Sequence, residues 1–323
     1  MTARGDGAIL VALGALLWGT GGIAAATITA HSGASATAVS ALRLLLGGLA
    51  VLGVTAATGQ LRRIPRTAAT ARHVGLTAAL TAVFGAAYFQ SVVQVGVAVA
   101  TVVALGGAPL VVAAYATVRA RRLPRLPVLV ALATSLAGLV LVCDVRGAGA
   151  VAPGDQAWGV ALALLAAVAF AATTVVNRRV LPGLAPAPLI ATSFTLAGLV
   201  SLVPAVPAGL ALGSFDATAW ATLAFLALVQ TAVGYLAFYA GLQRGVSATS
   251  AALLSLLEPV GATVLAVVVL GEDVTPAAAV GIVLVLGAVL LARDRPGGRA
   301  QRCRPWGRRR TAPRSDARPG APA

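Results

Sequence analysis

The sequence contains no lysine, only two histidines and two cysteines, and only 10% charged residues in a chain of 323. Soluble domains carry about 25% charged residues, so this composition excludes an ordinary water-soluble globular protein. Without lysine the chain cannot form a Schiff base or a P-loop nucleotide site. Two cysteines are too few for a disulfide framework or a CxxC-type metal site. HExxH and GxSxG motifs are also absent, and we therefore expect no enzyme, no metal site and no cofactor.

Apolar residues dominate instead, at 59% of the chain. Segments long enough to cross a bilayer as a helix, about 20 residues, recur from the N-terminus to about residue 293, and the first resembles a retained helix more than a cleaved signal peptide. The sequence therefore predicts an all-α integral membrane protein. Gly, Pro and Arg clusters separate ten expected transmembrane helices, at 8–30, 35–57, 73–93, 97–118, 126–145, 157–177, 186–207, 217–240, 246–270 and 274–292.

The arginines give this division an orientation. If the N-terminus is cytoplasmic, 22 of the 24 arginines fall in cytoplasmic segments, Arg146 falls in an outside loop and Arg43 lies within a helix. Cytoplasmic loops are rich in Lys and Arg, so we predict a multi-pass protein of the cell (plasma) membrane with both termini cytoplasmic. The net charge of +15 thus belongs to loops and the tail, and it does not indicate a nucleic-acid partner.

Two stretches of the membrane region resemble one another. Residues 93–109 read VQVGVAVATVVALGGAP, and residues 242–259 read LQRGVSATSAALLSLLEP. A weaker similarity relates residues 7–18 to residues 159–170. Because five helices per copy is an odd number, the second copy would enter the membrane inverted, and this 5+5 inverted repeat is a recurrent transporter architecture. We expect a first five-helix repeat, a second inverted repeat, and a disordered cytoplasmic tail with affinity for anionic lipid, at 1–148, 149–293 and 294–323.

The closing stretch LLEPVGATVLAVVVLGEDVTPAAAVGIVLVLGAVLL contains Glu258-Pro259 and Gly271-Glu272. With Trp18-Gly19 near the start and Arg43 in the second expected helix, it resembles the EamA-type branch of the drug/metabolite transporter superfamily, over about residues 7–293. The resemblance implies a secondary transporter of small organic solutes, such as amino acids, related metabolites or drugs, usually an exporter. The first repeat departs from the second, because Ala108 stands where the second has Glu258.

Only two charges lie well inside expected helices, Glu258 and Arg43. A charge near the bilayer centre costs about 2.5–3.5 kcal/mol, so such groups face the bundle interior and are functional candidates. Glu258 is expected near mid-depth, where it either couples proton movement, contacts a cationic part of the substrate, or acts as a structural acid. Arg43 lies nearer the outer end, where it could snorkel, pair with an acidic loop residue, or attract an anionic substrate group.

Two prolines and several aromatic or amide side chains complete the candidates. Pro109 and Pro259 each remove a backbone donor, so they are expected to break their helices, either as matching kinks or as pivots whose freed carbonyls line the path. Tyr235 and Tyr239 are four residues apart and share one helix face. For each aromatic or amide candidate, the alternative to a role in substrate binding is packing or anchoring at the membrane interface. The substrate-binding or coupling candidates are Trp18, Arg43, Tyr88, Gln94, Tyr235, Tyr239 and Glu258.

These observations favour a secondary transporter that exports a small organic solute by alternating access, with protons as the coupling ion. The expected partners are a small-molecule substrate and the lipid bilayer, and a homodimer is left open. Two alternatives also stay open at this point. One is a non-transporting membrane protein, either an enzyme acting on lipid-linked substrates or an assembly factor, and the other is an importer.

Overall fold

The computed structural model describes residues 3–143, 153–179, 181–270 and 275–291. Within these ranges the regular structure is helical, without a strand, which confirms the all-α class. Arg146, Gly271-Glu272 and the tail 294–323, for which expectations were given above, lie outside the described residues.

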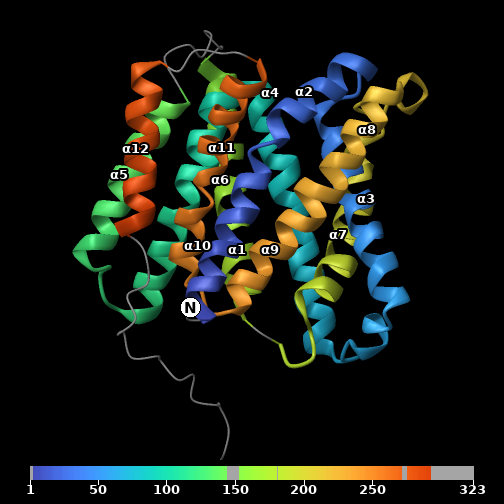
Figure 1. Ribbon diagram of the computed structural model, residues 1–323, viewed down its shortest axis with the longest axis horizontal. Coiled ribbons are helices and arrows are strands. Elements are labelled where there is room, and N and C mark those ends of the chain that lie inside the picture. The colour runs from blue at the N-terminus through green and yellow to red at the C-terminus, as the bar shows by residue number, and fades with distance from the viewer. Residues whose placement is uncertain (1–2, 144–152, 180, 271–274, 292–323) are drawn as a thin grey trace, which may run out of the picture. The chain divides into compact units, whose positions relative to one another are not determined.

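The helices run back and forth through one bundle (Figure 1). We call the end at which α1 begins the N-terminal end; it is the lower end in Figure 1. In chain order the elements are α1 (Ala3–Trp18), α2 (Gly21–Ser32), α3 (Ala36–Ala57), the 3₁₀ turn η1 (Gln60–Arg63), α4 (Ala68–Ala120), α5 (Leu126–Val142), α6 (Pro153–Asn177), α7 (Pro186–Ala205), the 3₁₀ turn η3 (Leu212–Ser214), α8 (Ala217–Phe225), the π-helix η4 (Leu226–Val233), α9 (Gly234–Gln243), α10 (Ala248–Leu254), α11 (Leu257–Leu265), the π-helix η5 (Ala266–Leu270) and α12 (Pro276–Leu291).

Seven helical stretches in the described part of the chain are long and apolar enough to cross a membrane. One of them, α4, has 53 residues, or roughly 80 Å at 1.5 Å per residue, which is more than two bilayer cores. Two further apolar helices, α5 and α12, are shorter. The ten expected spans coincide with these helices to within a few residues, while ten crossings arranged as a 5+5 repeat remain a prediction.

A glycine separates the two halves of α4. Gly96 is the one residue inside α4 with non-helical backbone angles, at φ 78° and ψ 163°. Gly245, its counterpart in the sequence similarity, joins α9 to α10 and also has a positive φ, 92°. This left-handed region suits glycine because it lacks a Cβ atom. Both helix-to-helix connections therefore depend on the missing side chain at this position.

Short polar side chains fix where several helices begin. Ser35 accepts a hydrogen bond from the Ala38 N–H at the start of α3, and Thr67 accepts one from Thr70 at the start of α4. Asp216 does the same for α8, with 2.7 Å to the Ala219 nitrogen. Each such N-cap satisfies a backbone donor that the helix itself leaves unpaired.

Small residues let the helices approach closely. A Cβ atom built on Gly138 of α5 would lie 2.7 Å from the Gly281 carbonyl oxygen of α12, and one on Gly281 would lie 2.6 Å from the Gly138 oxygen. A Cβ on Gly48 of α3 would lie 2.4 Å from the backbone nitrogen of Thr195 in α7. Because lipid removes the hydrophobic driving force between helices, such close backbone contact is a main source of their association.

Arginines gather at the N-terminal end. The connections from α3 to α4, from α4 to α5, from α6 to α7 and from α9 to α10 meet there, and each carries exposed arginine. The exposed arginines in or beside these connections are Arg62, Arg63, Arg66, Arg72, Arg119, Arg121, Arg122, Arg125, Arg178, Arg179 and Arg244. At the opposite end, the described connections 33–35 and 206–216 carry none. The fold thus collects in space the basic clusters that the sequence spreads along its length.

Candidate functional site

Trp18-Gly19 and Glu258-Pro259, which the sequence analysis singled out, meet in the bundle. α1 ends at Trp18 and α2 begins at Gly21, so the first span is interrupted at Gly19 and Thr20. The span that carries Glu258 is interrupted too, between the end of α10 at Leu254 and the start of α11 at Leu257. The interruptions face each other: a Cβ on Gly19 would lie 2.6 Å from the Glu258 carbonyl oxygen. Trp18-Gly19 therefore packs directly against Glu258-Pro259.

Glu258 lies in the first turn of α11 and is partly buried. Its backbone N–H donates to the Ser255 carbonyl at 3.0 Å, the carbonyl that Pro259 leaves without its usual partner four residues on. The first turn of a helix also favours negative charge, because its free N–H groups carry partial positive charge. The break thus sets a carboxyl group in the first turn of α11, next to the free backbone N–H groups of that helix.

Pro109 differs from the expectation of a matching helix break. α4 continues through it with helical backbone angles, and the interruption of α4 lies at Gly96 instead. A proline inside a helix removes one hydrogen bond, and other protein groups can compensate for that loss in a membrane protein. At Pro259, by contrast, the interruption lies only three to four residues earlier, at Ser255 and Leu256.

Arg43 is buried within α3, with 9% of its surface exposed. Its Nη1 donates to Gln230 Oε1 at 3.0 Å and to Thr231 Oγ1 at 3.2 Å, and Thr231 also donates to Gln230 Oε1 at 3.0 Å. Within the described residues the guanidinium makes no ion pair, so the alternative of an acidic loop partner is not seen there, and its hydrogen bonds go to a neutral amide and a hydroxyl. The charge of Arg43 therefore stays uncompensated by direct contact.

The partners of Arg43 lie on an irregular helix turn. Gln230 and Thr231 belong to the π-helix η4, which joins α8 to α9. A π-helical turn inserts an extra residue per turn and is often found at functional sites. Here it lies beside α3, which carries Arg43. The sequence gives no signal for a π-turn, although Gln230 and Thr231 form a conspicuous polar pair in an apolar stretch.

Aromatic rings form the next part of the site. The Trp18 ring lies 4.5 Å from that of Tyr235 and 4.9 Å from that of Phe238, both on α9. It also meets Phe170 of α6 edge-on at 6.0 Å. The Trp18 indole N–H is buried and has no hydrogen-bond partner within the described part of the chain, although buried donors are normally satisfied. The aromatic wall therefore contains one donor that a bound solute could satisfy.

Tyr88 extends this wall along α4. Its ring stacks on Phe84 at 5.9 Å, and its hydroxyl shares a hydrogen bond of 2.8 Å with Thr101. Arg43 and Glu258 act electrostatically on each other and on the hydroxyls of both Tyr88 and Tyr235. The structure thus brings together five of the predicted residues. We call them the central site: Trp18, Arg43, Tyr88, Tyr235 and Glu258.

Two predicted residues lie elsewhere. Gln94 lies two residues before Gly96, the interruption of α4, and its Cβ packs against Gly159 of α6. Tyr239 lies one helical turn from Tyr235 towards the N-terminal end and is almost fully buried. Sequence reasoning also left out Phe170 and Phe238 as wall residues, because phenylalanine in a membrane helix carries no signal that separates a binding wall from ordinary packing.

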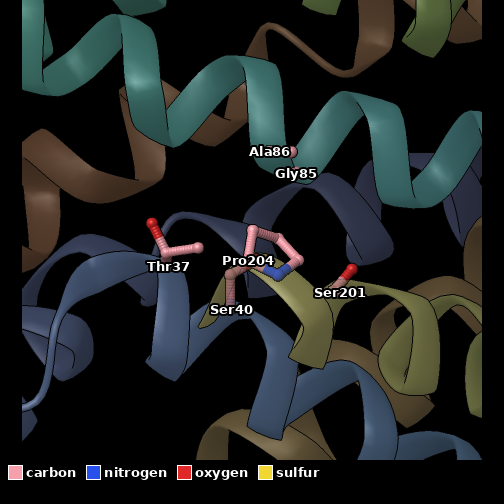
Figure 2. A pocket seen from close by; sticks show the side chains of 6 residues that line it. All are labelled: Thr37, Ser40, Gly85, Ala86, Ser201 and Pro204. Carbon is pink, nitrogen blue, oxygen red and sulfur yellow. The ribbon is translucent and has the colours of Figure 1, made fainter. Parts of the chain in front are cut away.

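A small cavity lies about one helical turn from Arg43 along α3 and from Tyr88 along α4. Thr37 and Ser40 of α3, Gly85 and Ala86 of α4, and Ser201 and Pro204 of α7 surround about 10 Å³ (Figure 2). This is room for at most one water molecule. The cavity is therefore too small for an organic solute.

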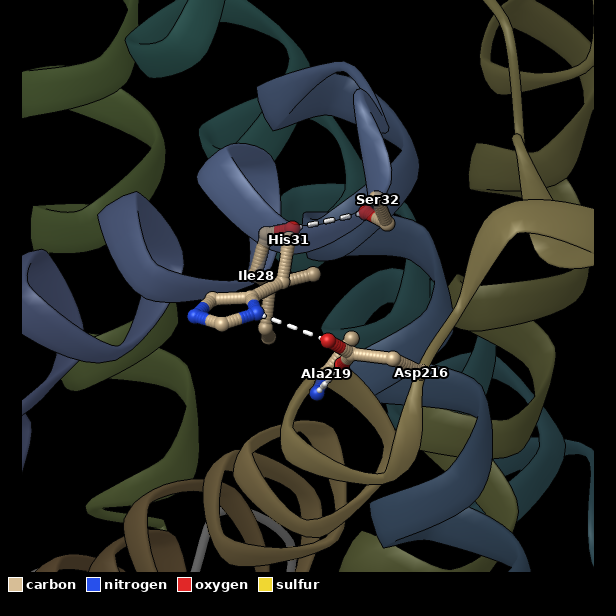
Figure 3. A network of polar contacts seen from close by, with 5 residues as sticks. All are labelled: Ile28, His31, Ser32, Asp216 and Ala219. Atoms are coloured by element: carbon tan, nitrogen blue, oxygen red, sulfur yellow. Dashed lines mark hydrogen bonds and ion pairs between the residues drawn. The ribbon is translucent and has the colours of Figure 1, made fainter.

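The end opposite the N-terminal end is held by polar contacts between loops. His31 Nδ1 of α2 lies 2.7 Å from Asp216 Oδ2 at the start of α8, as Figure 3 shows. The Ser214 hydroxyl also donates to the Ser32 carbonyl at 2.7 Å. The Ala219 backbone N–H, and then His31, hold the pKa of Asp216 below its usual range. These bonds join the α2–α3 connection to the α7–α8 connection.

Interrupted helices, a buried arginine and a partly buried carboxyl group lie together inside an apolar helical bundle. Broken helices that carry charged groups at mid-depth are features of membrane transporters. The fold and the site therefore define a multi-pass helical membrane protein of the transporter class.

Comparison with known proteins supports this class and makes it specific. Residues 157–293 match the model of the EamA-like transporter family. The chain is 29% identical over 308 residues to the uncharacterized transporter YwfM of Bacillus subtilis (strain 168), covering 89% of this chain and 94% of that protein. It is 27% identical over 301 residues to the uncharacterized inner membrane transporter YicL of Salmonella typhimurium (strain LT2), covering 90% and 96%. These matches confirm the predicted resemblance to EamA-type transporters of the drug/metabolite transporter superfamily.

A solved crystal structure supports the fold independently. It superposes on 90% of this chain and 97% of its own with a TM-score of 0.73, at 21% sequence identity. At this identity the likeness concerns the fold alone. Nearly the whole length of the solved chain is nevertheless matched by the helices described above.

Proposed function

We propose that this protein is a secondary transporter that exports small organic solutes by alternating access, with proton movement coupled at Glu258. The observation that carries the proposal is the central site, where Trp18-Gly19 packs against Glu258-Pro259 and Arg43 lies within electrostatic reach. A cation, a carboxyl group and aromatic walls suit a solute that has both charges and an apolar part, such as an amino acid or a related metabolite. The carboxylate of such a solute would lie towards Arg43 and its ammonium group towards Glu258.

The helix contacts support a 5+5 inverted repeat. Of the four most extensive helix contacts, two pair α3 with α7 and α5 with α12, which are the second with the seventh and the fifth with the tenth expected spans. If each span is replaced by its counterpart in the other half of the chain, each of these two pairs maps onto itself. The remaining pairs, α1 with α9 and α6 with α4, convert into one another. A two-fold relation of this kind would give two nearly equivalent arrangements, open to opposite sides.

Local contacts repeat as well. Gly7 packs against Arg244, where its ideal Cβ would lie 3.1 Å from the Arg244 Cβ, and Gly159 packs against Val95 at 2.5 Å from the Val95 Cγ1. The sequence similarity aligns Gly7 with Gly159 and Arg244 with Val95. Equivalent residues therefore make equivalent contacts, and this supports two copies of one five-helix unit.

The charge distribution supports an orientation. The arginine-rich N-terminal end corresponds to the cytoplasmic side, because Lys and Arg concentrate in cytoplasmic loops. Both termini would then be cytoplasmic, and the name of the relative YicL suggests the inner membrane as the location. A membrane-impermeant thiol reagent, applied to a cysteine added at the N-terminus, tests the orientation: labelling in intact cells contradicts it.

Reconstituted vesicles test transport itself. We expect wild-type protein in proteoliposomes to carry at least one compound from a panel of radiolabelled amino acids, metabolites and cationic drugs, faster when a pH gradient is imposed. Protein-free vesicles give the background. If correctly folded protein carries nothing under any gradient, the transporter proposal fails, and the alternative of a membrane enzyme or assembly factor gains support.

Substitution of Glu258 tests the coupling. Glu258→Gln keeps the size and hydrogen-bonding capacity of the side chain but cannot take up and release a proton. We expect the variant to exchange solute across the membrane without responding to a pH gradient. Tyr115→Phe, a change on the exposed surface of α4, serves as the control and keeps the gradient response. An unchanged gradient response in Glu258→Gln leaves Glu258 as a structural acid.

A further inference from the structure

A second polar cluster is buried between the central site and the N-terminal end. His73, Thr77 and Thr81 lie at intervals of four on one face of α4, Asn177 is the last residue of α6, and Tyr239 lies on α9. Asn177 Oδ1 accepts from Thr77 Oγ1 at 3.0 Å and lies 3.1 Å from His73 Nε2. We call these five residues the inner cluster. It joins three helices that belong to both halves of the chain.

Two atoms of the inner cluster have no hydrogen-bond partner among the residues that the structure describes. They are Asn177 Nδ2 and the Tyr239 hydroxyl, on residues with 0% and 1% of their surface exposed. The Tyr239 hydroxyl lies close to the side chains of Thr81 and Asn177, but among the described residues it meets the distance and angle requirements of a hydrogen bond with neither. Rotating the Asn177 amide would not help, because either orientation leaves one of its polar atoms in the unpartnered position. Buried polar groups are nearly always satisfied, so each exception needs an explanation.

The unpartnered atoms indicate what they would bind. Both can donate a hydrogen bond, so they match a hydrogen-bond acceptor. Arg178 and Arg179 directly follow Asn177 and are exposed at the same end, and their charge favours an anionic acceptor over a neutral one. A carboxylate combines an anionic charge with two acceptor oxygens. It is the same chemical group that Arg43 would attract in the central site.

The inner cluster lies directly next to the central site along α9. Tyr239 follows Tyr235 by one turn, or about 6 Å along the axis, and their rings meet edge-on at 5.9 Å. Tyr235 in turn contacts Trp18. A solute that moves from the central site to the N-terminal end along this face of α9 would therefore reach Tyr239 next.

We propose that the inner cluster is a second binding station, at the N-terminal end of the pathway, for the carboxylate of the transported solute. Asn177 Nδ2 and the Tyr239 hydroxyl donate to this carboxylate when α9 separates from α4 and α6. In the arrangement seen here the three helices are closed on one another and both donors are left unpartnered. The station rests on the proposed transport function, and it adds a binding step on one side only.

Sided transport measurements test the station. Wild type, Tyr239→Phe, Tyr235→Phe and Tyr115→Phe are placed in vesicles of uniform orientation, selected through a tag at the N-terminus. Uptake is measured with the radiolabelled amino acid that wild type carries fastest, supplied at either side. We expect Tyr239→Phe to raise the half-saturating concentration about tenfold at the N-terminal end, as for one lost hydrogen bond to a charged group, and by less than twofold at the other end. Tyr235→Phe, in the central site, changes both ends alike, and Tyr115→Phe changes neither.

Thermal stability of the solute-free protein gives a second measurement. Tyr239→Phe removes a buried hydroxyl that has no partner, so we expect the variant to unfold at a higher temperature than wild type. A hydroxyl with a merely structural role would be hydrogen-bonded, and its removal would lower the unfolding temperature.

The outcomes separate the two proposals. If wild type carries solute but Tyr239→Phe behaves alike at both ends, or loses stability, the station is refuted and the transport function stands. If wild type carries no amino acid, metabolite or drug of the panel, the transport function is refuted and the station with it.

Discussion

The contact between Trp18-Gly19 and Glu258-Pro259 makes a direct prediction. In Gly19→Ala the new Cβ would lie 2.6 Å from the Glu258 carbonyl oxygen and 2.8 Å from the Ala262 nitrogen. Both are backbone atoms, so no side chain can rotate away. Ordinary contact begins near 3.4 Å, so α11 must move by about 0.8 Å or the new methyl group must be strained. Overpacking of this kind costs about 1–3 kcal/mol.

We expect Gly19→Ala to lower the free energy of unfolding by that amount, measured by SDS titration in mixed micelles. The shift also moves Glu258 relative to Trp18, so transport should fall more than stability alone would explain. Gly22→Ala is the matched control, since its Cβ would meet no atom within 4 Å, and we expect it to be neutral or slightly stabilising. If Gly19→Ala is as stable and as active as Gly22→Ala, the close packing of Trp18-Gly19 against Glu258-Pro259 is refuted.

Three further predictions concern the helix contacts, the arginine and the far end. Gly281→Ala should lower the free energy of unfolding by about 1–3 kcal/mol, because its Cβ would lie 2.6 Å from a carbonyl oxygen of α5, whereas Gly287→Ala on the same helix meets nothing and should be neutral in the same SDS titration. Arg43→Ala should cost about 1–3 kcal/mol, since Gln230 Oε1 loses a buried donor, and Arg43→Lys should recover only part of this; an unchanged stability contradicts the hydrogen bonds. The lowered pKa of Asp216 gives stability that is present above the ordinary aspartate pKa and lost as pH falls through the lowered value. Thermal unfolding should therefore show a loss of stability at acid pH in wild type but not in Asp216→Asn. Asp216→Asn keeps the helix cap, so near neutral pH Asp216→Ala should be less stable than Asp216→Asn.

Much of the central site could be predicted from residue type and depth. A glutamate and an arginine within apolar segments are costly enough to indicate a function, and the structure brings Glu258 and Arg43 within electrostatic range of one another. Trp18, Tyr88 and Tyr235 were predicted with them, and all three line the same site. The partners of Arg43 could not be predicted, because they lie on a π-helical turn for which the sequence gives no signal.

The inner cluster shows the limit of sequence reasoning more clearly. Tyr239 was expected to act with Tyr235, since both occupy one helix face, yet one turn of helix places it in a different cluster. His73 and Asn177 are 104 residues apart in the chain, and neither spacing nor composition relates them. Only the packing of α4 against α6 brings them together.

The sequence by itself determined that this protein lies in the membrane, where its helices are and which connections carry the positive charge. These properties follow from the cost of placing charge and unpaired backbone groups in lipid, which each segment meets independently of its neighbours. The tertiary structure alone decided which helices touch, where the spans are interrupted, and which polar atoms are satisfied. These depend on close approach between segments far apart in the chain, such as the contact of Gly19 with Glu258, and that approach is set by the packing of the whole bundle.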